Sequence, residues 1–159
     1  MPQLVIAGVS GSGKSTIGEL VAQQLGVPFI DADDLHPITN VDKMTAGIPL
    51  TDDDRWPWLK KVGEAIGAAS ETGIVVACSA LRRSYRDAIR EAAPRTEFAM
   101  LTGSREVLAS RLGHREGHFM PATLLDSQLA ILEPLADDEA GATVEISGSP
   151  EQIARRIRP

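Results

Sequence analysis

The stretch "LVIAGVSGSGKST", residues 4–16, decides the fold. An apolar run leads into Gly8, and Gly13, Lys14 and Ser15 follow it at the spacing of a phosphate-binding loop. In such a loop the glycines let backbone N–H groups turn toward phosphate oxygens, the lysine reaches the β- and γ-phosphates and the serine binds Mg²⁺. We therefore expect nucleotide phosphates on the residues of this loop: Gly8, Ser10, Gly11, Ser12, Gly13, Lys14, Ser15 and Thr16.

Both flanks of the loop fit this interpretation. Residues 3–8 are typical of a short buried strand. Residues 14–25 carry apolar side chains at Ile17, Leu20, Val21 and Leu25, which is the spacing of a helix. The phosphates are therefore predicted at the N-terminus of a helix, where free N–H groups favour anions.

Composition excludes several classes of function. The 159 residues are 43% hydrophobic but only 4% aromatic, with a net charge of −6, so a base-stacking platform or a basic surface for nucleic acid or membrane is not expected. The single cysteine, Cys78, lies in an apolar segment and rules out an intramolecular disulfide or a cysteine zinc cluster. Without a membrane span or signal peptide, the protein is expected to be cytoplasmic.

Strands and helices are predicted to alternate along the chain. The expected strands are residues 3–8, 28–31, 73–80, 97–101 and 142–146, and the expected helices are residues 14–25, 52–71, 82–92, 104–113, 121–132 and 149–157. Thr51, Ser104 and Ser149 are expected N-caps. Apolar strands without two-residue alternation indicate a parallel sheet covered on both faces. We predict an α/β fold, one P-loop domain over residues 1–159 with a five-stranded parallel sheet and ligands at the carboxyl ends of the strands.

Two carboxylates distinguish between a switch, a motor and a transferase. The longest apolar strand ends "VVACSAL", without the acid that motors and ATPases use for Mg²⁺. Asp31 and Asp33 instead end the second strand, and in extended geometry residues two apart point to one side. Asp31 could then orient Mg²⁺ while Asp33 accepts a hydroxyl proton, as phosphoryl transfer to an alcohol requires. Alternatively, both are solvated turn carboxylates.

Longer motifs add a family resemblance. The segments "DADDLHP", "NVDKMTAGIPLTDDDRWPWL", "CSALRRSYRDAIR" and "SRLGHREGHFMPATLLDSQLAILE" follow the phosphate loop in this order. From about residue 4 to residue 135 the chain resembles the gluconokinases, small P-loop kinases related in fold to shikimate and adenylate kinases. The resemblance implies ATP and Mg²⁺ as cofactors, D-gluconate as the small-molecule acceptor and a homodimer as a possible assembly. A shikimate-like or nucleoside-monophosphate-like kinase and a non-catalytic nucleotide-binding module are the alternatives.

Gluconate carries hydroxyls and a carboxylate, so its site needs polar groups and a guanidinium. We expect Asp33 among these, and the other expected substrate-binding residues are His36, Lys43, Arg55, Arg82, Arg86, His118 and Gln128. Arg86 is favoured as the carboxylate partner, although two of the four arginines in residues 82–90 are expected to form only a solvated helix face. Trp56 and Trp58 are interpreted as packing anchors rather than a sugar pocket.

A short lid is expected over about residues 111–121. Arg111 and Arg115 lie one helical turn apart, and Gly113 and Gly117 interrupt the helix around them. By resemblance to related kinases, these two arginines are expected to stabilise the charge on the transferring phosphoryl group.

Overall fold

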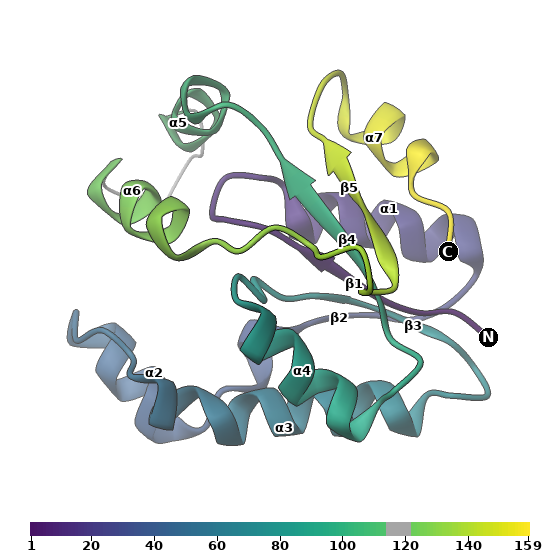
Figure 1. Cartoon of the computed structure of the whole chain (residues 1–159), viewed down its shortest axis with the longest axis horizontal. Helices are drawn as coiled ribbons and strands as arrows, with labels where there is room; N and C mark the ends of the chain where they lie inside the picture. Colours follow the sequence, from purple (N-terminus) through teal and green to yellow (C-terminus); the bar gives the residue numbers. More distant parts are fainter. Residues whose placement is uncertain (114–121) are drawn as a thin grey trace.

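The sheet consists of five parallel strands. The computed structural model describes residues 1–113 and 122–159. Its strands are β1 (Gln3–Ala7), β2 (Phe29–Asp31), β3 (Ile74–Ala77), β4 (Glu97–Thr102) and β5 (Gly141–Glu145), in the spatial order β2-β3-β1-β4-β5. Every neighbouring pair is parallel (Figure 1). The α/β fold class and the five-stranded parallel sheet are therefore confirmed.

Helices connect the strands and follow the last of them. They are α1 (Lys14–Leu25), the 3-10 turn η1 (Ala32–Leu35), α2 (Ile38–Thr45), α3 (Asp52–Ala68), α4 (Arg83–Ala92), α5 (Arg105–Gly113), α6 (Ala122–Ile131) and α7 (Pro150–Arg156). Thr51 and Ser149 form complete capping boxes, and Ser104 Oγ accepts a hydrogen bond from the Val107 N–H, so the expected N-caps are confirmed. Within the described ranges, no helix combines the length and the apolar character that crossing a membrane requires.

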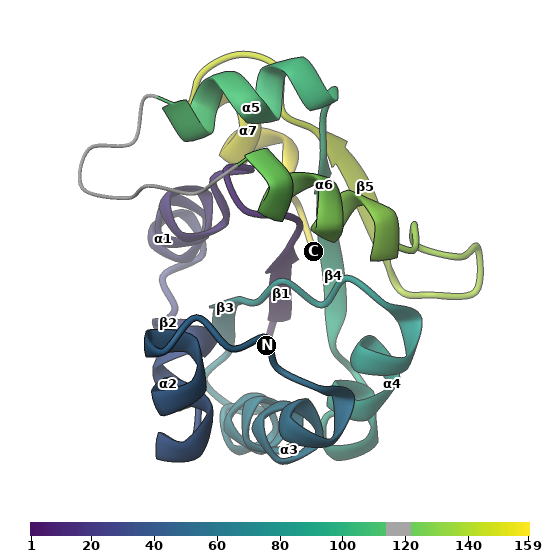
Figure 2. The same ribbon diagram turned by 90° about the vertical axis from the view of Figure 1, so that its left-hand side faces the viewer.

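Helices cover both faces of the sheet. Alternate residues of the strands point to opposite faces, so Val5 and Val76 enter one core and Ile6 and Val75 the other. The first core packs against α3 and α4, and the second against α1 and α7. Figure 2 shows the two layers separated by the sheet. The burial on both faces explains the continuous apolar strands.

Three differences from the expected elements bear on function. The third strand was expected over 73–80, but β3 ends at Ala77. Ala80 has a φ of 42°, which cannot continue a strand. The helix expected over 52–71 ends at Ala68, and β2 is followed by η1 and α2, which lie outside the expected helix ranges.

Strand register brings the polar chain segments together. Ala77 at the end of β3 pairs with Ile6 on one side and with Asp31 on the other. The carboxyl ends of β1, β2 and β3 therefore lie at one level of the sheet. The segments that follow these strands must meet at that edge.

Close packing of α3 on α4 gives a prediction for stability. A Cβ on Gly63 would lie 2.8 Å from the Ile89 carbonyl oxygen and 3.0 Å from Ala92 Cβ. Gly63→Ala should therefore lower the free energy of unfolding by about 1–3 kcal/mol, because overpacking outweighs the better helix propensity of alanine. Urea unfolding measures this change, and Glu64→Ala at the exposed neighbour is the control. A Gly63→Ala variant at least as stable as the parent would contradict it.

Candidate active site

The phosphate loop connects β1 to α1 in a conformation that glycine makes possible. Gly8, Gly11 and Gly13 have φ angles of 148°, 82° and 89°. A Cβ on Gly8 would lie 2.9 Å from Ser12 Oγ, so no larger residue fits there. Gly13 is the N-cap of α1 and provides no side-chain oxygen to the first amides of the helix. These amides are suited to an anion at the helix N-terminus.

Ser15 and Asp31 meet beside this loop. Ser15 Oγ donates a hydrogen bond of 2.8 Å to Asp31 Oδ2, and the Asp33 N–H donates one of 3.0 Å to Asp31 Oδ1. Both oxygen groups are of the type that Mg²⁺ prefers, with phosphates completing its coordination. Among the described residues no group of three or more His, Cys, Asp or Glu could hold a metal ion. The residues present thus fit an ion held largely by a bound nucleotide.

Asp33 lies near Asp31 by a route that differs from the expected one. We expected both carboxylates on one side of an extended strand, but β2 ends at Asp31 and Asp33 belongs to η1. Asp31 is the N-cap of η1 and holds the Asp33 amide. Burial raises the pKa of the Asp33 carboxyl and the charge of Asp31 raises it further, against the opposing effects of Lys14 and His36. Asp33 nonetheless remains exposed to solvent, and a raised pKa is what a general base for a hydroxyl proton needs.

The surroundings of His36 favour a neutral imidazole. Its ring stacks on Trp58 at 4.1 Å between centroids. Asn40 Nδ2 donates to the Asp54 carbonyl at 2.9 Å and lies 3.2 Å from His36 Nδ1, so Nδ1 is the acceptor and the proton is on Nε2. Burial lowers the pKa of His36, against the effect of Asp33, which favours the neutral ring over the protonated one.

Two tryptophans have different surroundings. The indole N–H of Trp58 donates to the Ala32 carbonyl at 2.7 Å, and the side chain is buried in the core. Trp58 is therefore the expected packing anchor. Trp56 is 37% exposed and forms a T-shaped contact with Tyr85, with 5.8 Å between the ring centroids.

Arg55 and Arg82 lie in one cluster with Tyr85 and Asp52. Arg55 Nη1 donates to Asp52 Oδ1 at 2.9 Å and to the Tyr85 hydroxyl at 3.3 Å, and Tyr85 donates to Asp52 at 2.6 Å. The hydrogen bond from Tyr85 lowers the pKa of Asp52, and the charges of Arg55 and Arg82 contribute. The buried Nε of Arg82 has no hydrogen-bond partner in the described part of the chain. Among the described residues, Arg82 Nε, like Arg90 Nη1, thus lacks the acceptor that a buried donor normally has.

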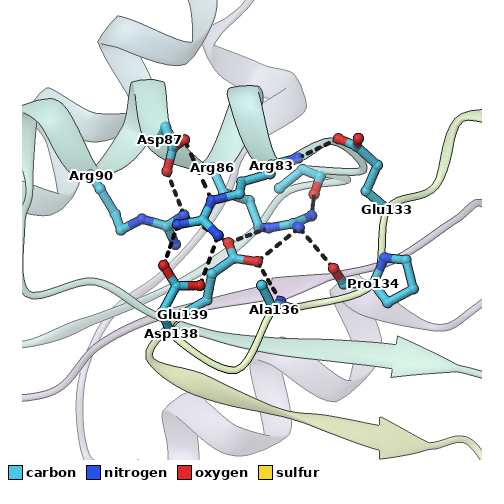
Figure 3. A network of polar contacts seen from close by, with 10 residues as sticks. Arg83, Arg86, Asp87, Arg90, Glu133, Pro134, Ala136, Asp138 and Glu139 are labelled. Carbon is cyan, nitrogen blue, oxygen red and sulfur yellow. Dashed lines mark hydrogen bonds and ion pairs between the residues drawn. The ribbon is translucent and has the colours of Figure 1, made fainter.

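Arg86 does not occupy the place that we expected for it. Its side chain is fully buried, with Nε and Nη2 donating to the two oxygens of Glu139 at 2.8 and 3.0 Å (Figure 3). Nη1 donates to the Ala80 carbonyl at 2.9 Å, and Nη2 also contacts the Pro134 carbonyl. With its guanidinium occupied by protein oxygens, Arg86 is poorly placed to bind a substrate carboxylate. The expectation that favoured it is corrected.

The neighbouring arginines have other partners. Arg83 pairs with Asp138 and Asp87, and Arg90 pairs with Asp87 and with the buried Glu139. Only Arg83 thus resembles the solvated helix face that was expected of two arginines in this segment.

Three other expected site residues lie within the described ranges. Lys43 forms a 2.8 Å ion pair with Asp54, which belongs to the capping box of α3. Gln128 contacts the phosphate loop, because its Oε1 accepts from the Ser10 N–H at 2.7 Å and its Nε2 donates to Ser10 Oγ at 3.1 Å. Arg111 Nη2 donates to the Ile146 carbonyl at 3.1 Å, and its Nη1 lies next to Gly13. Two more, Arg115 and His118, lie outside the described residues.

Three polar residues of this region were missed in the sequence. Asn40 orients His36, Tyr85 joins Arg55 to Asp52, and Glu139 pairs with Arg86. The only sequence signal for Tyr85 is its place in the "SYRD" segment after the third strand. Asn40 and Glu139 lie in segments that look like ordinary polar surface.

Known proteins resemble this chain over most of its length. Residues 10–158 match the family model described as shikimate kinase. The thermosensitive gluconokinase of Escherichia coli K12 is 44% identical, with 97% of this chain and 84% of that protein covered, and the gluconokinase of Gluconobacter oxydans is 48% identical, with 97% and 88% covered. A crystal structure of a gluconokinase from Sinorhizobium meliloti 1021 is 50% identical with a TM-score of 0.88, covering 97% of this chain and 87% of that one. A shikimate kinase from Acinetobacter baumannii in complex with shikimate, 20% identical with a TM-score of 0.65 and 98% and 90% covered, shows the common fold.

The buried pair of Arg86 and Glu139 gives a prediction for acid stability. Burial raises the pKa of Glu139, but hydrogen bonds from Arg86, the Ala136 N–H and Arg90 outweigh it and lower the pKa to about 2 from 4.5. The stability that the carboxylate contributes is thus complete above about pH 4.5 and is lost as the pH falls toward 2. We expect Glu139→Gln to reduce the free energy of unfolding by about 3 kcal/mol at pH 7 and by less at pH 3.

Urea unfolding of parent and variant across this pH range measures the difference. Glu64→Gln, at an exposed carboxylate, is the control. A Glu139→Gln deficit that stays constant from pH 7 to pH 3 would show that the charge of Glu139 contributes nothing.

Proposed function

The chain belongs to the shikimate kinase family and, within it, to the gluconokinases, and on this premise we propose that it transfers the γ-phosphoryl group of ATP to the 6-hydroxyl of D-gluconate. The products are 6-phospho-D-gluconate and ADP. The observation that carries the proposal is a juxtaposition at the carboxyl ends of the strands. The phosphate loop follows β1, Asp33 with its raised pKa lies just past β2, and Arg82 lies in the loop after β3.

The phosphate side of the reaction uses the first helix and its loop. Bound MgATP would supply the phosphoryl group, and its Mg²⁺ would offset the negative charge of the phosphate oxygens. Loop amides and Lys14 are proposed to hold the phosphates, while Ser15 and Asp31 hold Mg²⁺. Arg111 beside Gly13, with Arg115 from the same segment, is proposed to neutralise charge on the transferring group.

The acceptor side requires a base for the 6-hydroxyl proton. Asp33 is proposed for this role, because its carboxyl has a raised pKa and lies near Lys14 of the phosphate loop. His36, with its proton on Nε2, can donate to an acceptor hydroxyl oxygen. Lys43, His118 and Gln128 remain proposed contributors to the acceptor site.

The acceptor carboxylate is assigned to Arg82 with Arg55. The buried Nε of Arg82 finds no partner in the described ranges, and a carboxylate oxygen would supply one. Arg55 lies in the same cluster and keeps its hydrogen bonds to Asp52 and Tyr85. A guanidinium suits this task better than an ammonium, because its donors match the geometry of a carboxylate.

Acceptor-dependent ADP release tests the proposed function. The purified protein with MgATP should release ADP rapidly with D-gluconate and slowly with shikimate, nucleoside monophosphates or other aldonates. ADP release at the same rate with and without every acceptor would instead indicate an ATPase. ATP binding without ADP release would indicate a non-catalytic module. The homodimer implied by the resemblance and the cytoplasmic location expected from the sequence remain predictions, and sedimentation of the same preparation measures the assembly.

Removal of the proposed base should separate turnover from nucleotide binding. Asp33→Asn is expected to reduce kcat by about 100-fold or more, because general base catalysis typically contributes this much, with the Kd for ATP nearly unchanged. The neighbouring Asp34→Asn substitution removes an exposed carboxylate and should retain turnover. If Asp33→Asn retains parental kcat, another group accepts the proton.

Removal of the proposed carboxylate partner should act on gluconate alone. Arg82→Ala is expected to raise the KM for gluconate by about 10- to 100-fold, the loss of a charge-assisted hydrogen bond, with the KM for ATP little changed. Arg83→Ala is the matched control, because that side chain is exposed and pairs with Asp138. Equal effects of the two substitutions on the KM for gluconate would place the carboxylate elsewhere.

A further inference from the structure

The loop of residues 79–82, between β3 and α4, is held by contacts to three consecutive carbonyl groups. The Ser79 carbonyl accepts from the Gly8 N–H of the phosphate loop at 3.2 Å. The Ala80 carbonyl accepts from Arg86 Nη1 at 2.9 Å, and the Leu81 carbonyl accepts from the Glu133 N–H at 2.7 Å. These three donors come from separate parts of the chain. The backbone of the loop therefore has little freedom to move.

One residue of this loop has an unfavourable backbone conformation. Ala80 has a φ of 42° and is the one non-glycine residue with positive φ in residues 1–113 and 122–159. A residue with a Cβ adopts this region at a cost, because the Cβ crowds a carbonyl oxygen. Such a conformation persists only where the surrounding contacts enforce it.

Arg86 is itself fixed on the side away from Ala80. Glu139 binds it through both carboxylate oxygens, and Glu139 also accepts from the Ala136 N–H and Arg90 (Figure 3). Because Arg86 and Glu139 are both buried, their pairing is shielded from water. The position of Nη1 at the Ala80 carbonyl is thus set by a rigid network.

The orientation of the next side chain depends on this loop. Arg82 is the N-cap of α4 but makes no capping hydrogen bond, and the Glu133 carboxylate accepts from the Arg83 N–H instead. Arg82 is thereby left beside Asp52 and Tyr85 with its Nε unpartnered in the described part of the chain. Its direction is a consequence of the backbone of residues 79–82.

We propose that Arg86 is a positioning residue of the acceptor site, which holds Ala80 in its left-handed conformation so that Arg82 points at the acceptor carboxylate. This inference rests on the proposed function, in which Arg82 binds that carboxylate. Arg86 acts through the backbone and touches no substrate. It differs in this respect from the role that its place in the sequence suggested.

Arg86→Lys tests the proposal while keeping the charge opposite Glu139. A single ammonium cannot bind both Glu139 oxygens and the Ala80 carbonyl with the geometry of a guanidinium. We expect the KM for gluconate to rise about tenfold, as for loss of one charge-assisted hydrogen bond, with the KM for ATP within about twofold of the parent. Arg86→Gln with Glu139→Gln, which leaves no buried charge unpaired, is a second form of the test should Arg86→Lys not fold.

Arg90→Lys is the matched control. Arg90 contacts the same Glu139 oxygen as Arg86, but it has no hydrogen bond to the carbonyls of residues 79–82 in the described structure. Both substitutions should lower the melting temperature, and only Arg86→Lys should raise the KM for gluconate. An unchanged KM in Arg86→Lys, or an equal rise in Arg90→Lys, overturns the proposal.

Ala80→Gly provides a rescue. Glycine adopts positive φ without the Cβ contact, so adding Ala80→Gly to Arg86→Lys should return the KM for gluconate most of the way to the parental value. If the raised KM came only from a general loss of stability, Ala80→Gly would not lower it. A KM that stays raised in the double variant counts against the proposal.

Hydrogen exchange separates this proposal from the proposed function. The Arg83 amide, held by Glu133, should exchange faster in Arg86→Lys than in the parent or Arg90→Lys, whatever the acceptor is. Unchanged exchange overturns the positioning role even if gluconate is the substrate. Parental protein that lacks gluconate-dependent turnover overturns the proposed function, and the exchange result still decides the role of Arg86.

Discussion

Parallel pairing of β3 with both β1 and β2 is the constraint on which the rest of the structure depends. Ala77 is in register with Ile6 on one side and Asp31 on the other, so three strands end at one level. Parallel strands always present their carboxyl ends at the same edge, and the chain that follows each strand must turn there. The hydrogen bond from the Gly8 N–H to the Ser79 carbonyl joins two of these turns directly. Phosphate-binding and acceptor-binding segments are therefore neighbours because of the sheet, before any side chain contributes.

Those features that depend on local sequence could be predicted. The glycine spacing of residues 8–13, the apolar strands and the caps at Thr51 and Ser149 are all encoded within a few residues of where they act. Proximity of Ser15 to Asp31 followed from parallel topology, since Ser15 opens the helix after the phosphate loop that follows β1, and Asp31 ends β2. Asp31 and Asp33 are close, but the extended-strand geometry that we predicted for them was wrong. A three-residue strand followed at once by a 3-10 turn has no distinctive sequence signal, whereas Asp31 as its N-cap explains the contact.

Features that depend on distant partners could not be predicted. Arg82 and Arg86 lie one turn apart, and no local pattern indicates that one is fully buried while the other retains an unpartnered nitrogen among the described residues. The deciding residue is Glu139, 53 positions from Arg86, in a segment that resembles a surface turn. Gln128 is a similar case, because its partner Ser10 is 118 residues away. A charged side chain in a helix is usually solvated, so the helical pattern alone does not predict the buried ion pair of Arg86 and Glu139.

The position of β1 has a consequence for synthesis of the chain. Its residues emerge from the ribosome before those of its partners, yet β1 lies in the middle of the sheet. Its partners come later, from residue 74 onward in β3 and from residue 97 onward in β4. Until those segments emerge, an apolar strand has no sheet to join. Pairings so distant in sequence are slow to form, because loop closure must come before the contacts that stabilise it. The nascent chain thus carries an unpaired hydrophobic strand until β3 and β4 have emerged, the interval in which a chaperone would be of most use.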